Sequence, residues 1–345
     1  MLALTQHVLS HGVTSYSVPC GTVVILFICF VLQIGVVRIT AIPLGLYSLS
    51  FLPAALLLVF LTNLLVFNWG IIIFCIVLFL LFMLWALFGL RSNEESVQTN
   101  TVQLLMQNLL ILTIVCGFTG AMSNTNDKIH YELRMQRCLL NDDAGKVLGV
   151  ADKFLQTNLR MTALRASALN SYGEMGSKLF EYPLCGESKE LLIPASDSVS
   201  MLYNPINLTA KIDSLPYEST VSVINYLQET MSRDTCWTDS VAVRDYWLCA
   251  LLLDKHLERF AQEFSKFYKE DMKNLDSVPK HYREALVLYM RTTFNPQIIW
   301  NEDEVMNTNY EEFLKMQKSN LPPVAKENLL RRSFGETYWW YYNYR

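Results

Sequence analysis

The first 123 residues carry almost no charge, and this limits the folds that they can adopt. Four charged residues lie in this stretch, while every other Lys, Arg, Asp and Glu follows Ser123. Charged residues make up only 17% of the whole chain, against about 25% in a typical soluble domain. The sequence therefore predicts a transmembrane domain at 1–123 and a soluble domain at 124–345. The four early charges are Arg38, Arg91, Glu94 and Glu95.

Four apolar runs divide the transmembrane domain. A helix needs about 20 apolar residues to cross the hydrocarbon of a bilayer. Lipid offers no hydrogen-bond partners to backbone N–H and C=O groups, so each crossing segment must satisfy them within a helix. The runs therefore predict four membrane helices; the alternative is three, with the first run lying at the membrane interface. Pro53 is expected to kink the second helix. The predicted spans are about 21–40, 44–67, 70–90 and 101–120.

The positions of the early arginines predict an orientation. With four spans, Arg38 and Arg91 lie in the two loops on the side opposite to the soluble domain. Lys and Arg close to membrane helices favour the cytoplasm. We therefore expect residues 124–345 to lie outside the cytoplasm.

The fourth predicted span contains a small polar cluster. Gln103 and Gln107 are four residues apart and share a helix face near one membrane boundary, and Asn108 follows them. The cluster could form a polar path or a substrate site. Hydrogen bonding between helices, worth about 1 kcal/mol per contact, is the interpretation that we favour.

The soluble domain shows the periodicity of amphipathic helices and no alternating strand pattern, so an all-α fold is expected. Residues 184–215, which hold several prolines, are interpreted as a connector. The helices from 218 to 293 are separated by short breaks, as in stacked helix pairs, and predict a tetratricopeptide-like helical-repeat domain, although no clean 34-residue period is visible. The predicted helices are 218–232, 239–254, 257–272, 279–293, 309–317 and 323–334.

No catalytic motif is present, and no catalytic residue, metal or cofactor is predicted. His281 and Glu284 are three residues apart on one predicted helix, but a solvated helix face is the favoured interpretation. The net charge of −4 is well mixed and gives no indication of nucleic-acid binding. Four cysteines of the soluble domain are interpreted as free thiols, with one disulfide as the alternative. They are Cys138, Cys185, Cys236 and Cys249.

Aromatic residues dominate the C-terminus. They would bury a large apolar area if packed, which suggests a tail that folds back onto residues 279–293 and caps the repeat array. The alternatives are a surface that binds a partner and an anchor at the membrane interface. The residues concerned are Tyr338, Trp339, Trp340, Tyr341 and Tyr342.

Several motifs occur in an order that resembles a known family. They are SLSFLPA at 48–54, SKLFEYP at 177–183, VPKHYREALVLY at 278–289 and GETYWWYY at 335–342. The chain is similar, from about Tyr47 onward, to an uncharacterised family of multi-span membrane proteins of the Bacteroides group, whose members carry a tetratricopeptide-like region after their spans. This resemblance implies a shortened member, a bacterial inner membrane and a periplasmic C-terminal domain. It implies no activity.

Together these features predict a membrane-anchored scaffold. Its helical-repeat domain would bind a protein or another component of the envelope, with membrane lipid around the spans. The alternative is a transporter or a lipid-handling membrane enzyme with a site between the spans, near Gln103, Gln107 and Asn108.

Overall fold

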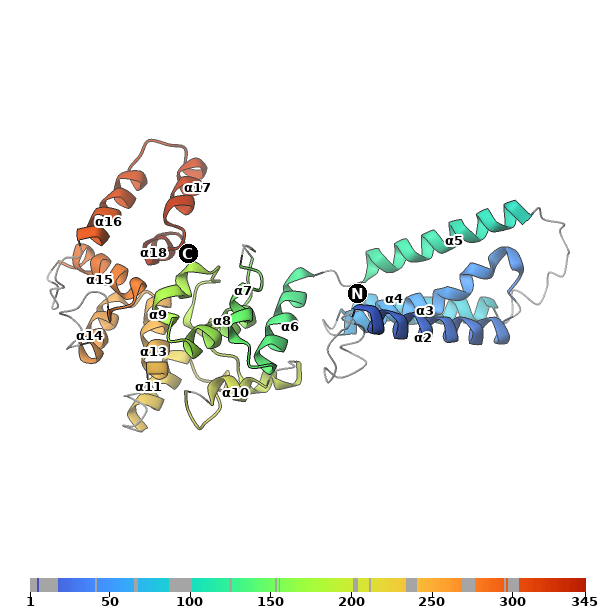
Figure 1. Ribbon diagram of the computed structural model, residues 1–345, viewed down its shortest axis with the longest axis horizontal. Helices are drawn as coiled ribbons and strands as arrows, with labels where there is room; N and C mark the ends of the chain where they lie inside the picture. The colour runs from blue at the N-terminus through green and yellow to red at the C-terminus, as the bar shows by residue number, and fades with distance from the viewer. Residues whose placement is uncertain are drawn as a thin grey trace. The chain divides into compact units, whose positions relative to one another are not determined.

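Figure 1 shows a computed structural model, in which helices are the only regular secondary structure of the described residues. The chain divides into two compact units, Met1–Asp127 and Lys128–Arg345, and each is described by itself. The structure describes residues 5, 18–40, 42–64, 68–86, 101–123, 126–152, 154, 156–200, 204–210, 212–233, 241–268, 277–294, 296 and 304–345.

The first unit is built from apolar helices. Three stretches, Cys20–Ile39, Leu44–Leu64 and Thr101–Met122, are long and apolar enough to cross a membrane. The third predicted span corresponds to a shorter apolar helix, and its predicted residues 87–90 lie outside the described part of the chain. The elements are α2 (Val18–Ile39), η1 (Leu44–Phe51), α3 (Leu52–Leu64), α4 (Trp69–Leu84) and α5 (Thr101–Met122).

The second span changes its geometry near its proline. It begins as the 3₁₀ segment η1 and continues as α3 from Leu52. Pro53 is the second residue of α3, a position where the missing N–H of proline costs no helical hydrogen bond. The proline thus lies at the junction between the two segments, the position at which the sequence predicts a kink.

The second unit is a series of helices joined by short connections. Consecutive helices from α13 to α18 pack on one another, and α18 also packs on α15. The longer elements are α6 (Asp127–Leu140), α7 (Ala144–Gly149), α8 (Leu159–Ser171), α11 (Val223–Arg233), α13 (Val241–Leu253), α14 (Leu257–Phe267), α15 (Lys280–Thr292), α16 (Glu304–Gln317), α17 (Pro323–Phe334) and α18 (Tyr338–Tyr344). The shorter ones are α9 (Met175–Lys178), η4 (Leu179–Glu181), η5 (Ser188–Glu190), η6 (Ala195–Ser200) and α10 (Pro205–Thr209).

The segment at 184–215 is more than a connector, so that interpretation is wrong. Three consecutive apolar residues of this segment are fully buried: Leu191, Leu192 and Ile193. The first two pack into one hydrophobic cluster of the unit and Ile193 packs into a second one. The segment is also hydrogen-bonded to the residue that follows α13: the backbone N–H and the hydroxyl of Ser188 both donate to the carboxylate of Asp254, at 2.8 and 2.7 Å. It therefore belongs to the packed body of the unit.

Candidate functional site

The aromatic C-terminus forms a helix that the sequence did not predict. Thr337 is its N-cap, and the Thr337 hydroxyl accepts a hydrogen bond from the Trp340 N–H at 3.3 Å. The helix, α18, has only seven residues. Helices this short are unstable alone in water, so α18 depends on its packing for its conformation.

Two tyrosines of α18 close the end of α13. The Tyr338 hydroxyl donates to the Leu252 carbonyl at 3.0 Å. The Tyr341 oxygen lies 2.7 Å from the Leu253 carbonyl and 2.8 Å from that of Gly186, and its single proton serves one of them at a time. The last carbonyls of a helix have no partner within the helix. These hydroxyls therefore satisfy buried acceptors at the C-terminus of α13.

A buried carboxylate on α15 fixes the start of α18. Glu284 accepts hydrogen bonds from the Tyr338 N–H at 2.7 Å and lies 2.9 Å from Nδ1 of His281. The Trp339 indole N–H donates to the Glu284 carbonyl at 2.8 Å. The tail thus lies against 279–293, as the sequence predicted. Its role as the cap of a repeat array stays a prediction.

The interpretation of His281 and Glu284 as part of a solvated face is wrong. Their exposed fractions are 0% and 1%, and the edge of the Phe180 ring covers the imidazole. Nδ1 of His281 makes the contact with Glu284, and Nε2 has no hydrogen-bond partner among the described residues. The signal was present in the sequence, because positions 285–289 are apolar all round the helix, which is typical of a buried helix.

Phe180 of η4 connects these parts. Its ring packs edge-on against Tyr338 and Tyr341, each with 5.0 Å between ring centroids, as well as against His281. On the other side of α18, Trp339 packs on Tyr310 of α16 at 5.1 Å. The aromatic helix therefore joins η4, α13, α15 and α16, elements that are far apart in the sequence.

The burial of the tail limits what it can offer to a partner. Tyr338, Trp339, Trp340 and Tyr341 are buried within the unit, and only Tyr342 of the predicted set is partly exposed. A cavity of about 220 Å³ adjoins the helix and is lined by Trp340 and Tyr341 together with charged groups. Most of the predicted aromatic surface is therefore part of the core.

A second buried polar group lies where α13 meets α15. The Tyr282 hydroxyl donates to the carboxyl of Asp245 at 3.1 Å and lies 3.5 Å from the sulfur of Cys249. Burial raises the pKa of Asp245 to about 6, against the opposing effects of the Arg244 charge and of the Tyr282 hydrogen bond. Burial also raises the pKa of the Cys249 thiol, so this thiol is a poor nucleophile.

The other predicted residues of the second unit are placed as follows. Cys138, Cys185 and Cys249 are free thiols, and Cys236 lies outside the described residues. The sequence favoured buried thiols, but only Cys249 is buried: Cys138 is partly buried and Cys185 is exposed. Within the described part of the chain, no group of three or more His, Cys, Asp or Glu side chains is arranged to hold a metal ion.

The polar trio of the first unit does not act as one group. Asn108 bridges α5 to η1: its amide donates to the Leu44 carbonyl at 2.8 Å and its oxygen accepts from the Ser48 N–H at 2.7 Å. Gln103 and Gln107 are exposed on α5. Asn108 therefore forms hydrogen bonds between two segments of the membrane unit. Both the oxygen and the nitrogen of its amide bind the protein's own backbone.

The described residues are those of an all-helical membrane protein. It has apolar helices long enough to span a bilayer and a second helical unit that ends in an aromatic helix. Residues 224–345 match a family model described as a family of unknown function (DUF6057). The match begins in α11 and includes the His281–Glu284 pair and the whole of α18. No curated protein and no solved structure gives a significant match to the chain.

Proposed function

We propose that the protein is a membrane-anchored interaction protein, whose helical unit binds a protein partner through the outer side of α17. One observation carries this proposal: α17 is apolar on two sides. Leu330 and Phe334 are buried in the unit. Val324 and Leu329 are 73% and 39% exposed, and Leu321 just before the helix is 42% exposed.

A helix with one solvated face is expected to be polar there. On the exposed side of α17, Ala325 and Leu329 are neighbours one turn apart, while Val324 lies further round the helix, with the exposed polar residues Asn328 and Arg332 between them. We call this exposed side, with its apolar residues set among polar ones, the strip; protein-binding surfaces combine apolar and polar side chains in this way. The area is modest, so a partner helix or an extended segment fits it better than a large rigid surface does.

The finer features of the proposal concern the repeat and the membrane. Alternate helices begin at Val241, Lys280 and Pro323, with each helix packing on the next, which supports a tetratricopeptide-like series of helix pairs. The spacings exceed the roughly 34 residues of that repeat. Arg38 and Arg91 support a multi-pass protein whose helical unit lies outside the cytoplasm, which is the periplasm in the bacterial inner membrane that the family resemblance implies.

Charge placed on the strip tests the proposal. The double change Val324→Asp and Leu329→Asp in the full-length protein should abolish the partner complex seen on extraction from native membranes. Because both side chains are exposed, the melting temperature should change little, as surface substitutions usually cost within about 0.5 kcal/mol. Val241→Asp on α13 is the matched control, since Val241 is another exposed valine. A complex that survives the double change would remove α17 as the binding surface.

A further inference from the structure

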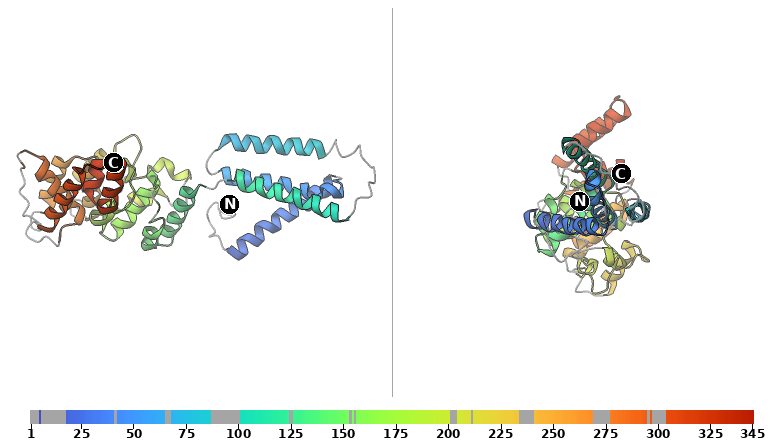
Figure 2. Two further views of the ribbon diagram at one scale, coloured as in Figure 1. Left: turned by 90° about the horizontal axis from the view of Figure 1, so that it is seen from above. Right: turned by 90° about the vertical axis from the view of Figure 1, so that its right-hand side faces the viewer.

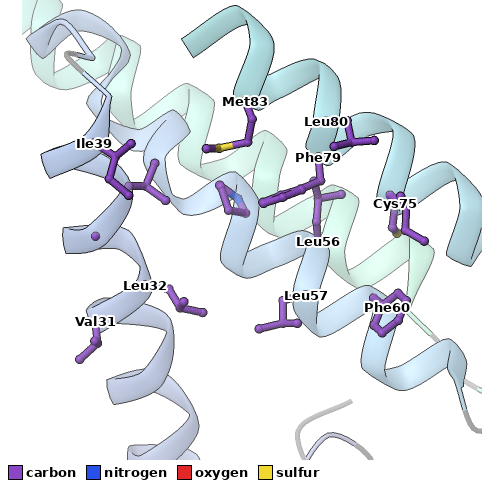
Figure 3. A pocket seen from close by; sticks show the side chains of 14 residues that line it. Val31, Leu32, Ile39, Leu56, Leu57, Phe60, Cys75, Phe79, Leu80 and Met83 are labelled. Atoms are coloured by element: carbon purple, nitrogen blue, oxygen red, sulfur yellow. The ribbon is translucent and has the colours of Figure 1, made fainter. Parts of the chain in front are cut away.

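An apolar groove lies in the first unit between α2, α3 and α4. Its volume is about 550 Å³, within the roughly 300–1,000 Å³ that is usual for small-molecule sites. In Figure 3 the labelled side chains of Val31, Leu32 and Ile39 from α2 lie across an open space from Phe79 and Met83 of α4. The lining is apolar throughout.

The arrangement of the helices produces this groove. α2 packs on η1 and α3, while α4 packs on the other side of α3, which forms the floor. Figure 2 shows α2 running at an angle to its neighbours. Gln33 fixes α2 at this angle by donating to the hydroxyl of Ser50 at 3.1 Å, and both side chains are buried. The groove is therefore held open by a specific contact.

Small residues in the walls prevent the groove from being filled by the chain itself. Gly35 faces it from α2, and a Cβ atom there would meet nothing within 4 Å. Cys75 of α4 and Pro53 of α3 also line it. From Val31 to Ile39 the wall extends roughly 12 Å along α2, which is enough for a substantial part of an extended hydrocarbon chain.

A single positive charge stands at one end of the groove. Arg38 is exposed in the last turn of α2, next to the lining residue Ile39. Among the described residues of 18–123, Arg38 is the only charged one. A guanidinium can bind a phosphate through two parallel hydrogen bonds. Because Arg38 lies at the end of a helix long enough to span the membrane, its guanidinium is expected at the level of the phospholipid headgroups.

We propose that this groove binds one anionic glycerophospholipid, with an acyl chain between α2, α3 and α4 and the phosphate on Arg38. The charge complementarity selects this occupant over a zwitterionic lipid, whose positive headgroup gains less from an arginine. It also selects a lipid over an apolar helix of a second copy, which would leave Arg38 unused. The inference is independent of the partner surface on α17.

Lipid binding to the purified full-length protein in detergent micelles tests the proposal. The probes are dioleoyl phosphatidylglycerol and dioleoyl phosphatidylcholine, which share their chains and differ in headgroup charge. Native mass spectrometry counts the bound lipids. We expect one tightly retained phosphatidylglycerol, and Arg38→Gln should reduce its affinity roughly tenfold and abolish the headgroup preference. Arg38→Lys should keep much of the preference.

Filling the groove tests the acyl-chain part. Gly35→Leu should abolish retention of both lipids, because its side chain enters the open space. Gly117→Leu on α5 is the matched control, since Gly117 also has nothing within 4 Å of its Cβ position and does not line the groove. Leu80→Trp fills the groove from α4 at an exposed position, in case Gly35→Leu does not fold.

Three results would overturn the proposal. Equal retention of the two lipids by the wild-type protein would show that the headgroup is not recognised. Unchanged retention in both Gly35→Leu and Leu80→Trp would show that lipid binds elsewhere. A wild-type dimer that dissociates on either filling change, without retained lipid, would identify a second copy of the chain as the occupant.

Discussion

Glu284 organises the C-terminal site at the level of single residues. Glu284→Ala would leave two buried polar groups, the Tyr338 N–H and Nδ1 of His281, without their hydrogen-bond partner. Each buried polar group left unsatisfied costs about 1–3 kcal/mol, so the free energy of unfolding should fall by about 2–6 kcal/mol. Glu181→Ala is the matched control, because its ion pair with Lys280 is partly exposed and worth at most about 1 kcal/mol. Thermal unfolding that ranks the two variants equally would refute the role given to Glu284.

Asp245 should make stability depend on pH. Its pKa is raised from 3.8 to about 6, so the fold favours the neutral carboxyl. The stability that this group contributes is present below about pH 4 and is lost as the pH rises through 6. Asp245→Asn should therefore be stabilising relative to wild type at pH 7.5, by roughly 3 kcal/mol, and near neutral at pH 4. Melting temperatures across this range measure the difference, and a gap that does not depend on pH would contradict the assignment.

Gly176 is the position where packing of α9 on α15 leaves least room. A Cβ atom at this glycine would lie 2.6 Å from Cζ of Tyr282 and 2.9 Å from Cβ of Pro279. Gly176→Ala should therefore lower the free energy of unfolding by about 1–3 kcal/mol through overpacking. Gly149→Ala, which has nothing within 4 Å of its Cβ position, is the control. Equal melting temperatures for the two variants would show that the contact is looser than described.

At the scale of elements, α18 contributes to stability rather than standing as a free tail. Trp339 is buried between α15 and α16, and its removal should lower the free energy of unfolding by about 3–5 kcal/mol. Tyr344→Ala changes a partly exposed residue of the same helix and should cost far less. If Trp339→Ala melts like the wild type but loses a partner or a membrane contact, the tail is an interaction element and not a cap.

The elements differ in how well the sequence predicts them. The bounds of α17 follow from Pro323 and Gly335, which fix its start and its end. α18 could not be predicted, because seven aromatic and polar residues show no periodicity and its conformation depends on tertiary contacts. The groove in the first unit also gives no sequence signal, since the angle of α2 arises from a hydrogen bond between distant residues.

At the scale of the whole molecule, the apolar helices and the helical unit carry different functions in this account. Under the proposed function, the first would hold the protein in the membrane, and the second would present α17 to a partner outside the cytoplasm. Reporter fusions after Gly120 and in the loop at Arg91 should give opposite compartment signals. A cytoplasmic signal from the fusion after Gly120 would reverse the proposed orientation.

Site-specific photocross-linking in native membranes tests the binding surface most directly. A photoreactive amino acid at Val324 or Leu329 should give a discrete adduct with one protein, because these side chains would lie in the interface. The same group at Lys315, an exposed polar position on α16, should give none. We expect an adduct from the two α17 positions and none from the α16 position. Identical patterns from Lys315 and Val324, or no adduct from either α17 position, would contradict it.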